Sequence, residues 1–398
     1  MSMTSASRAR NEVSGARLCV VGIGGAGSNA VNRMLDTGLN GVNMIAMNTD
    51  QDALRLCRAP LRLALGPDTT RGLGAGGDPG VGKRAAEETR TDIKRALQGS
   101  DMVFLTAGMG GGTGTGASPI VADVARELGA LTVAVVTKPF GFEGPRRRRL
   151  AEAGIDELRS RVDTVIVVPN DRLLEFEDQS ITLTEAFACA DDMLRQGVQG
   201  ISDIITIPGC INVDFADVEA TMRDAGTAMM GIGQAEGPDR AVEAARLAVS
   251  SPLLETSVSG ALRVLINVTS GPDLTLAEAH DAATLIRELC HPDEARIIVG
   301  WVLDKSMEGR VRITVLATGF SEAARLPERA ATHNAERARP MPDVEPVPVP
   351  VPAAAQPDER QAAPVSVQTI LAAQAAGDDL LGTLDEDELD RPTFFRRR

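Results

Sequence analysis

The sequence predicts an α/β fold with a parallel-sheet domain, a long central helix, a second smaller α/β domain with a mixed sheet, and a disordered C-terminal tail. Short apolar runs alternate with helical patterns as far as residue 170, which is typical of a parallel sheet with helices on both faces. Apolar residues then recur at helical spacing across residues 181–205, which predicts one long helix. From Ser321 the composition shifts to Ala, Pro, Glu and Arg, which is typical of a disordered segment.

The length and composition predict more than one domain. At 398 residues the chain exceeds what one hydrophobic core usually supports, and 43% of its residues are hydrophobic. We expect a disordered extension at residues 1–16, the parallel-sheet domain at 17–180, the central helix at 181–207, the second domain at 208–320, a disordered linker at 321–384 and a terminal peptide at 385–398.

The charge and the rare residues exclude several function classes. A net charge of −14 argues against a nucleic-acid partner, because nonspecific binding of nucleic acid needs a basic face. The five cysteines show no CxxC pairing, and three histidines offer little material for a zinc site or a histidine-based triad. The polar N-terminus lacks the apolar core of a signal peptide, and no stretch approaches a membrane-spanning length. We therefore expect a cytoplasmic protein without direct membrane insertion.

The first glycine turn lies within residues 17–29, between a predicted strand and a helix expected over Ala30–Thr37. It fits the dinucleotide pattern G-x-G-x-x-G with Gly22, Gly24 and Gly27. Asp50 follows the next strand, Val42–Met47, where a ribose-binding acid would stand. Taken alone, this pattern suggests an NAD-dependent oxidoreductase, but the same geometry places any nucleotide phosphate at a helix N-terminus.

A second glycine-rich stretch imitates a P-loop. Gly77–Lys83 has the spacing G-x-x-x-x-G-K, but Arg84 stands where the magnesium-binding Ser or Thr is required, and no strand precedes the loop. We therefore reject a P-loop here; a helix from about Lys83 to Gln98 is instead implied by the family resemblance given below.

The most informative stretch is Gly108–Gly116. It follows Met102–Ala107, a predicted buried strand, and precedes a helix expected over Ala117–Leu128. A run without Cβ atoms lets successive N–H groups converge on one anion, while Thr113 and Thr115 add hydroxyl donors. A flexible linker is the alternative, but a linker has no reason to lie between a buried strand and a helix.

The run Gly110–Gly116 resembles the signature loop shared by tubulins and the FtsZ family of bacterial cell-division GTPases. Thr106–Gly110 and Thr137–Phe140 resemble the FtsZ family in particular, and the similarity extends from about Arg17 to Phe320. The resemblance implies a GTPase that binds GTP or GDP, with Mg²⁺ carried by the nucleotide and no separate metal site. The implied residues on the phosphate side are Gly24, Gly25, Ala26, Gly27, Ser28, Asn29, Asn48, Asp50, Ala75, Gly110, Gly111, Gly112, Thr113, Gly114, Thr115 and Gly116.

The resemblance also implies contacts to the rest of the nucleotide. They are Glu143 on the ribose, Arg147 beside the phosphates, Asn170 after the strand Val165–Pro169, Phe187 under the guanine ring and Asp191 at the base edge. The residues alone leave other roles open, because the arginines at 146–149 suit a solvated helix face and Phe187 suits a core. Guanine specificity rests on the resemblance, since Thr137–Phe140 lacks the final Asp of the Ras-type guanine motif.

A second motif, Pro208–Val218, follows the long helix. Asn212, Asp214 and Asp217 concentrate an amide and two carboxylates on one loop. On spacing alone, Asp214 or Asp217 would cap the next short helix. The run Asn212–Val218 resembles the synergy loop of the FtsZ family, and this resemblance implies a catalytic role for Asn212, Asp214 and Asp217.

The synergy-loop motif and the glycine loops are predicted to lie at opposite ends of the long helix. At about 1.5 Å per residue the separation is about 35 Å, so the carboxylates cannot reach their own subunit's nucleotide. A head-to-tail neighbour would have to supply them, and a heterologous contact that does not close makes a filament. We therefore expect GTP hydrolysis at a site shared between subunits of a homopolymer.

The second domain is expected to contain strands near 263–268, 295–302 and 311–317 and helices near 240–249 and 276–289. Beyond it, Pro346–Pro352 suggests a polyproline II segment. The end of the chain, Asp390–Arg398, resembles the C-terminal peptide of the FtsZ family, whose partner is a membrane tether or a division regulator. Phe394 and Phe395 would be its anchors.

The resemblance implies a role in the cytokinetic ring, at the division site at midcell. Three alternatives stay open: a specialised paralogue that forms a structural filament with weak GTPase activity, an organelle- or plasmid-specific tubulin relative, and the NAD-dependent oxidoreductase. The oxidoreductase would not explain the central glycine loop or the carboxylate motif.

Overall fold

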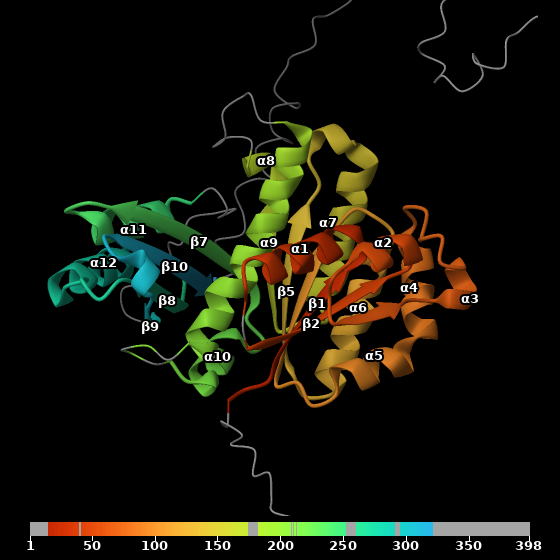
Figure 1. Ribbon diagram of the computed structural model, residues 1–398, viewed down its shortest axis with the longest axis horizontal. Helices are drawn as coiled ribbons and strands as arrows, with labels where there is room; N and C mark the ends of the chain where they lie inside the picture. The colour runs from red at the N-terminus through yellow and green to blue at the C-terminus, as the bar shows by residue number, and fades with distance from the viewer. Residues whose placement is uncertain are drawn as a thin grey trace, which may run out of the picture. The chain divides into compact units, whose positions relative to one another are not determined.

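The computed structural model describes residues 15–39, 41–173, 182–207, 209, 211, 213–251, 260–290 and 295–320. Within these residues, ten strands form one sheet in the order β3-β2-β1-β4-β5-β6-β7-β10-β8-β9 (Figure 1). The strands are β1 Leu18–Ile23, β2 Val42–Asn48, β3 Leu61–Ala64, β4 Met102–Gly108, β5 Leu131–Lys138, β6 Thr164–Pro169, β7 Gly226–Glu236, β8 Arg263–Ser270, β9 Arg296–Leu303 and β10 Arg310–Thr318.

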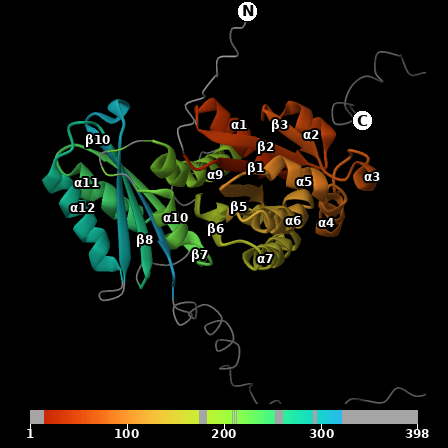
Figure 2. The same ribbon diagram turned by 90° about the horizontal axis from the view of Figure 1, so that it is seen from below.

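The first part of the sheet is parallel from β3 to β7. Its central strands β1, β4 and β5 are buried except at the last residue of β4 and of β5, as expected for strands covered on both faces. Figure 2 shows helices on both faces of this part of the sheet. The helices of this part are α1 Gly24–Asp36, α2 Gln51–Leu56, α3 Pro67–Thr70, α4 Pro79–Glu88, α5 Arg90–Leu97, α6 Thr113–Glu127, α7 Pro145–Arg159 and α8 Asn170–Leu173. The predicted parallel sheet is confirmed.

The long helix α9, Leu183–Thr206, lies between the first six strands and the second domain (Figure 1). Its buried residues include Leu194, Val198 and Ile201, which share a hydrophobic core with Met230 of β7 and Leu316 of β10. The helix begins with a capping box, in which Thr182 accepts from the Glu185 N–H and the Glu185 carboxylate accepts from the Thr182 N–H.

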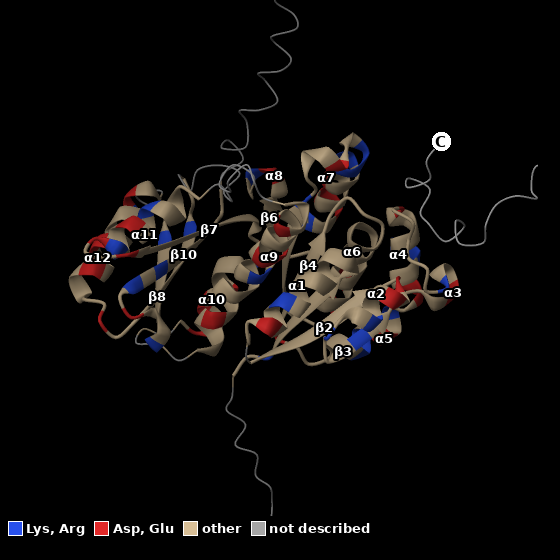
Figure 3. Ribbon diagram, turned by 45° about the horizontal axis from the view of Figure 1, so that its top comes forward, with Lys and Arg blue, Asp and Glu red and all other residues tan. Residues whose placement is uncertain are grey.

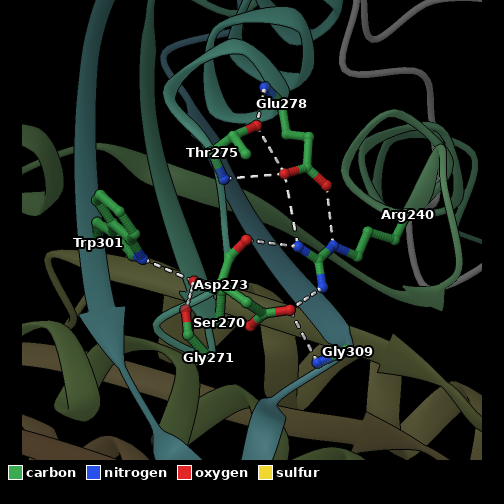
Figure 4. A network of polar contacts seen from close by, with 8 residues as sticks. All are labelled: Arg240, Ser270, Gly271, Asp273, Thr275, Glu278, Trp301 and Gly309. Atoms are coloured by element: carbon green, nitrogen blue, oxygen red, sulfur yellow. Dashed lines mark hydrogen bonds and ion pairs between the residues drawn. The ribbon is translucent and has the colours of Figure 1, made fainter.

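The second domain has the mixed sheet that the sequence predicts. β10 is antiparallel to both β7 and β8, whereas β8 and β9 are parallel. Helices α11, Arg240–Val249, and α12, Leu276–Leu289, cover its core, and α10, Phe215–Met222, precedes β7. Figure 4 shows a polar network in this domain, in which the Arg240 side chain pairs with Asp273 and Glu278.

Three predicted helix boundaries were wrong. Helix α1 begins at Gly24 rather than Ala30, and α6 begins at Thr113 rather than Ala117, so part of each glycine loop is the first turn of a helix. The helix expected over Lys83–Gln98 is instead two helices, α4 and α5, separated at Thr89. Glycine has a low helix propensity, but close packing between elements outweighs it here.

Glycines allow that close packing between α4 and α6. A Cβ on Gly116 of α6 would lie 2.0 Å from the Pro79 carbonyl oxygen, and a Cβ on Gly82 of α4 would lie 2.4 Å from the Gly112 carbonyl oxygen. The stretch that imitates a P-loop is therefore a helix whose Asp78 side chain accepts from the Gly80 N–H.

None of the described helices combines the length and the apolar character needed to span a bilayer. The predicted disordered extension up to residue 14, the linker and the terminal peptide with Phe394 and Phe395 lie outside the described residues.

Candidate functional site

A pocket of about 460 Å³ opens where strands β1, β4, β5 and β6 end. The carboxyl ends of parallel strands are the usual ligand-binding edge of such sheets. Its volume lies in the range of small-molecule sites, which is roughly 300–1,000 Å³. The pocket is lined by Ile23, Gly24, Gly25, Ala26, Asn29, Gly108, Met109, Gly111, Gly112, Thr113, Gly114, Thr137, Pro139, Glu143, Arg147, Asn170, Phe187, Ala190 and Asp191.

Two helix N-termini form the floor of the pocket. Gly24 begins α1 with φ of +73°, a conformation that favours glycine, and a Cβ there would lie 3.1 Å from the Gly114 N of α6. The first turn of each helix presents N–H groups without intrahelical partners, and the helix dipole adds positive potential. The floor is therefore suited to bind phosphate.

Hydrogen bonds hold the central glycine loop in place. The hydroxyls of Thr49 and Thr113 lie 2.6 Å apart, which ties the end of β2 to the start of α6. The Thr115 hydroxyl accepts from the Gly110 N–H at 2.8 Å. These contacts fix the backbone before a ligand arrives, which lowers the entropy cost of binding.

Phe187 of α9 lines the pocket together with two polar side chains, Asn170 and Asp191. The rings of Phe140 and Phe142 are stacked at 5.1 Å, and the Phe187 ring meets Phe140 edge-on at 5.4 Å. Asn170 is buried, and its Oδ1 has no hydrogen-bond partner among the residues that the structure describes. Because a buried acceptor without a partner is costly, this atom is suited to a donor on a ligand.

Burial changes the acidity of Asp191. Loss of solvent raises the pKa of the Asp191 carboxyl to about 7, although the positive charge of Arg33 opposes the shift. The group is therefore poised to change charge near neutral pH when a ligand binds beside it.

The start of α7 carries a run of four arginines, Arg146–Arg149 (Figure 3), of which Arg147 lines the pocket. Arg147 forms an ion pair with Glu143 one helical turn earlier, and the Glu143 carboxylate also accepts from the Phe140 N–H at 2.9 Å. Both side chains line the pocket, so Arg147 can turn toward an anion and Glu143 toward a hydroxyl.

Several predicted residues do not line the pocket. They are Gly27, Ser28, Asn48, Asp50, Ala75, Gly110, Thr115 and Gly116. Asp50 instead caps α2, where its Oδ1 accepts from the N–H groups of Asp52 and Ala53. Ala75 lies behind the loop, since a Cβ on Gly112 would lie 2.7 Å from its side chain.

Six lining residues were not among the predicted ones: Ile23, Gly108, Met109, Thr137, Pro139 and Ala190. All except Ala190 lie at or just beyond the carboxyl ends of β1, β4 and β5. That position is the signal that would have identified them.

The two predicted carboxylates lie elsewhere, beyond the far end of α9. Asp214 caps α10, and its Oδ1 accepts from the Asp217 N–H at 2.8 Å. Phe187 and Asp191 lie in the first part of this helix of 24 residues, which is about 36 Å long at 1.5 Å per residue. Neither carboxylate lines the pocket, and Asn212, predicted beside them, lies outside the described residues.

The donors around the pocket do not suit a resident metal ion. Within the described residues, no group of three or more His, Cys, Asp or Glu side chains is arranged to hold one. The pocket floor offers N–H groups, whereas Mg²⁺ prefers oxygen ligands. A magnesium ion here would take its ligands from phosphate oxygens and water.

Comparisons with known proteins agree with this geometry. Residues 17–178 match the Tubulin/FtsZ family, GTPase domain, and residues 226–321 match the FtsZ family, C-terminal domain. A dimer of FtsZ from M. jannaschii, solved without ligand, is 44% identical, with a TM-score of 0.73 and coverage of 76% of this chain and 88% of that chain. CetZ2 from Haloferax volcanii, a GTPγS-bound protofilament, is 22% identical, with a TM-score of 0.66 and coverage of 80% and 99%, and shows the shared fold.

Proposed function

Because the chain belongs to the FtsZ family of tubulin-like GTPases, we propose that it is a self-assembling GTPase whose hydrolytic site is shared between adjacent subunits. The observation that carries the proposal is the separation of the two halves of the site. Within the described residues, the pocket has phosphate-binding backbone, and its lining does not include Asp214 or Asp217, which lie beyond the opposite end of α9. A second copy stacked head to tail would bring the halves together.

In the shared site, the first turns of α1 and α6 hold the phosphates of GTP, and Mg²⁺ bound to the phosphates offsets their charge. Phe187 lies under the guanine, Asp191 accepts from its N–H groups, and Glu143 receives the ribose. The next subunit supplies Asn212, Asp214 and Asp217, whose carboxylates orient and polarise the attacking water. Catalysis of phosphoryl transfer depends chiefly on such positioning and charge stabilisation.

A head-to-tail contact repeats without closing, so the product is a filament. The FtsZ of M. jannaschii at 44% identity was solved as a dimer, which supports self-association of this chain. We place the filament in the cytoplasm, in the bacterial cytokinetic ring at midcell. Asp390–Arg398, with Phe394 and Phe395 as anchors, would bind a membrane tether or a division regulator. A fusion protein spread evenly through dividing cells would contradict this location.

Turnover should depend on protein concentration. We expect phosphate release from GTP with Mg²⁺ to be negligible below a threshold and to rise linearly above it, because assembly completes the site. Measuring release against protein concentration tests this. Constant activity per molecule down to dilute protein would mean a self-contained site, and GTP binding without turnover would instead indicate a paralogue that serves as a structural filament.

Guanine binding should weaken as the pH falls. The Asp191 carboxyl has a pKa of about 7 because it is buried, and only its ionised form accepts from both guanine N–H groups. With that pKa, the ionised fraction falls about tenfold between pH 8 and pH 6, and affinity for GDP should fall by about the same factor. Titrations with fluorescent GDP at a series of pH values measure this.

The matched control is Asp191→Asn, whose amide does not titrate. Titration of the nucleotide's own phosphates is common to both proteins and cancels in the comparison. An equal pH dependence in the two proteins would remove Asp191 from the base site.

A further inference from the structure

The cluster at the far end of α9 contains a cation that no motif predicts. Arg296 is the first residue of β9, and its Nη2 donates to Asp217 Oδ1 at 3.1 Å. Asp217 lies in the first turn of α10, capped by the neighbouring Asp214. A basic side chain on the second domain therefore touches one of the two carboxylates that we assign to the shared site.

The ion pair between Arg296 and Asp217 contributes little to the stability of the folded protein. The Arg296 side chain is 60% exposed and the Asp217 side chain 41% exposed. An exposed pair of this kind contributes only about 0–1 kcal/mol to stability. A guanidinium carries five N–H donors, and within the described residues Arg296 uses one of them in a side-chain hydrogen bond. Donors are thus left for another acceptor.

If the proposed function holds, the Arg296–Asp217 pair would help to balance the charge at the shared site. Stacking would bring two carboxylates, Asp214 and Asp217, against a negatively charged triphosphate. On the pocket side, Arg147 is the single cation among the described lining residues, and Glu143 already pairs with it. A second cation that arrives with Asp217 would offset the repulsion.

We propose that Arg296 is a catalytic residue supplied in trans, which donates to the γ-phosphate oxygens of the next subunit's GTP while Asp217 holds it in place. The water oxygen bonds to the γ-phosphorus, the bond to the β,γ-bridging oxygen breaks, and its electron pair leaves with GDP. The water proton passes through the carboxylates to the released phosphate. Arg296 keeps all its protons and stabilises the charge that moves onto the phosphate oxygens.

The test uses the full chain with GTP and Mg²⁺, above the assembly threshold. Arginines supplied in trans contribute about 10³–10⁵ to turnover in other GTPases. Because Asp217 partly neutralises Arg296, we expect a smaller loss of kcat in Arg296→Gln, about 10²-fold, with KM and the threshold concentration within about twofold of wild type. Arg296→Lys keeps the charge but not the planar fork, so it should recover part of the loss.

Arg263→Gln is the matched control. Arg263 of β8 lies opposite Arg296 of β9 in the register of the parallel strands. The Arg263 Nη1 donates to the Ala220 carbonyl oxygen of α10 at 3.4 Å. We expect near-normal turnover from it. An equal loss in both variants, or a loss in Arg296→Gln that disappears at high protein concentration, would mean that the arginines only support the interface, and would overturn the proposal.

Binding of GDP with aluminium fluoride, which imitates the transferring phosphoryl group, gives a readout independent of turnover. Wild-type filaments should trap it, and Arg296→Gln should not; equal trapping would overturn the proposal. The variant Asp214→Ala distinguishes a failure of the proposed shared site from a failure of the proposed role of Arg296. If it hydrolyses normally, the shared site itself is wrong, whereas an inactive Asp214→Ala beside a normal Arg296→Gln would reject Arg296 alone.

Discussion

Asp214→Ala should lose GTP turnover by a factor of about 10²–10⁴ while it still binds GTP, which is the usual contribution of a positioned acid–base group. Binding should survive because Asp214 does not line the pocket and lies beyond the far end of α9. Turnover should fail because the neighbour's nucleotide loses the carboxylate that orients water. Phosphate release above the assembly threshold, together with equilibrium binding of GTP, measures both quantities.

The side chain of Asp214 also caps α10, so a structural effect must be separated from a chemical one. Losing the cap costs about 1 kcal/mol. Asp214→Asn keeps an oxygen that can accept from the Asp217 N–H but removes the negative charge. If only the alanine variant is inactive, the cap is what matters; if both are inactive with filaments still forming, the carboxylate is required. A fully active alanine variant would contradict the shared site.

Much of the parallel sheet could be predicted from the sequence, because buried strands have continuous apolar runs. The predicted strand Met102–Ala107 and the observed β4, Met102–Gly108, differ by one residue. The glycine loops were correctly placed after β1 and β4, and the residues that the FtsZ resemblance assigned to the base, Phe187 and Asp191, do line the pocket.

Strand β7 was missed because its glycines serve packing. Its sequence, Gly226–Glu236, looks like a loop. A Cβ on Gly231 would lie 1.9 Å from the Ala248 carbonyl oxygen, and a Cβ on Gly233 would lie 2.0 Å from that of Ala244. The strand needs glycine so that α11 can approach it, and this need exists only in the folded protein.

Contacts between segments that are far apart in the sequence also could not be predicted from sequence patterns. The Arg296–Asp217 ion pair joins residues 79 positions apart, and it exists because β9 begins beside the first turn of α10. Nothing in the local sequence around either residue indicates the other. The loop that we propose to be catalytic was identified by its resemblance, whereas the contact between Arg296 and this loop could be found only from the structure.

Arg240→Met should destabilise the second domain by about 1–3 kcal/mol, less than for a fully buried ion pair, because the partners Asp273 and Glu278 are 34% and 22% exposed. The Arg240 side chain is 9% exposed and joins Asp273, which precedes α12, to Glu278 inside α12 (Figure 4). The Asp273 carboxylate also accepts from the Gly309 N–H at 3.1 Å, so the network ties two loops to α11. Methionine fills the space but leaves both carboxylates without their cation.

The loss of stability in Arg240→Met can be followed with a probe inside the second domain. Trp301 is the only tryptophan of the chain, it lies in β9, and its indole N–H donates to the Ser270 hydroxyl at 2.8 Å. The midpoint of urea unfolding followed by tryptophan fluorescence therefore reports the second domain. Arg246→Met is the matched control on the same helix. Because Arg246 is 65% exposed and pairs with Glu243, its loss should change stability by less than about 0.5 kcal/mol.

The destabilisation caused by Arg240→Met should be smaller at acidic pH. The ion pair with Arg240, helped by the Thr275 N–H and hydroxyl, lowers the pKa of the Glu278 carboxyl from 4.5 to about 2. A depressed pKa stabilises the folded protein above the unfolded value, and this stabilisation is lost as the pH falls from about 4.5 toward 2. Wild type should therefore lose stability between pH 7 and pH 3 faster than Arg240→Met, which lacks the main cause of the shift. If the difference between the two unfolding midpoints is the same at pH 7 and pH 3, Arg240 stabilises the domain through packing and its charge is irrelevant.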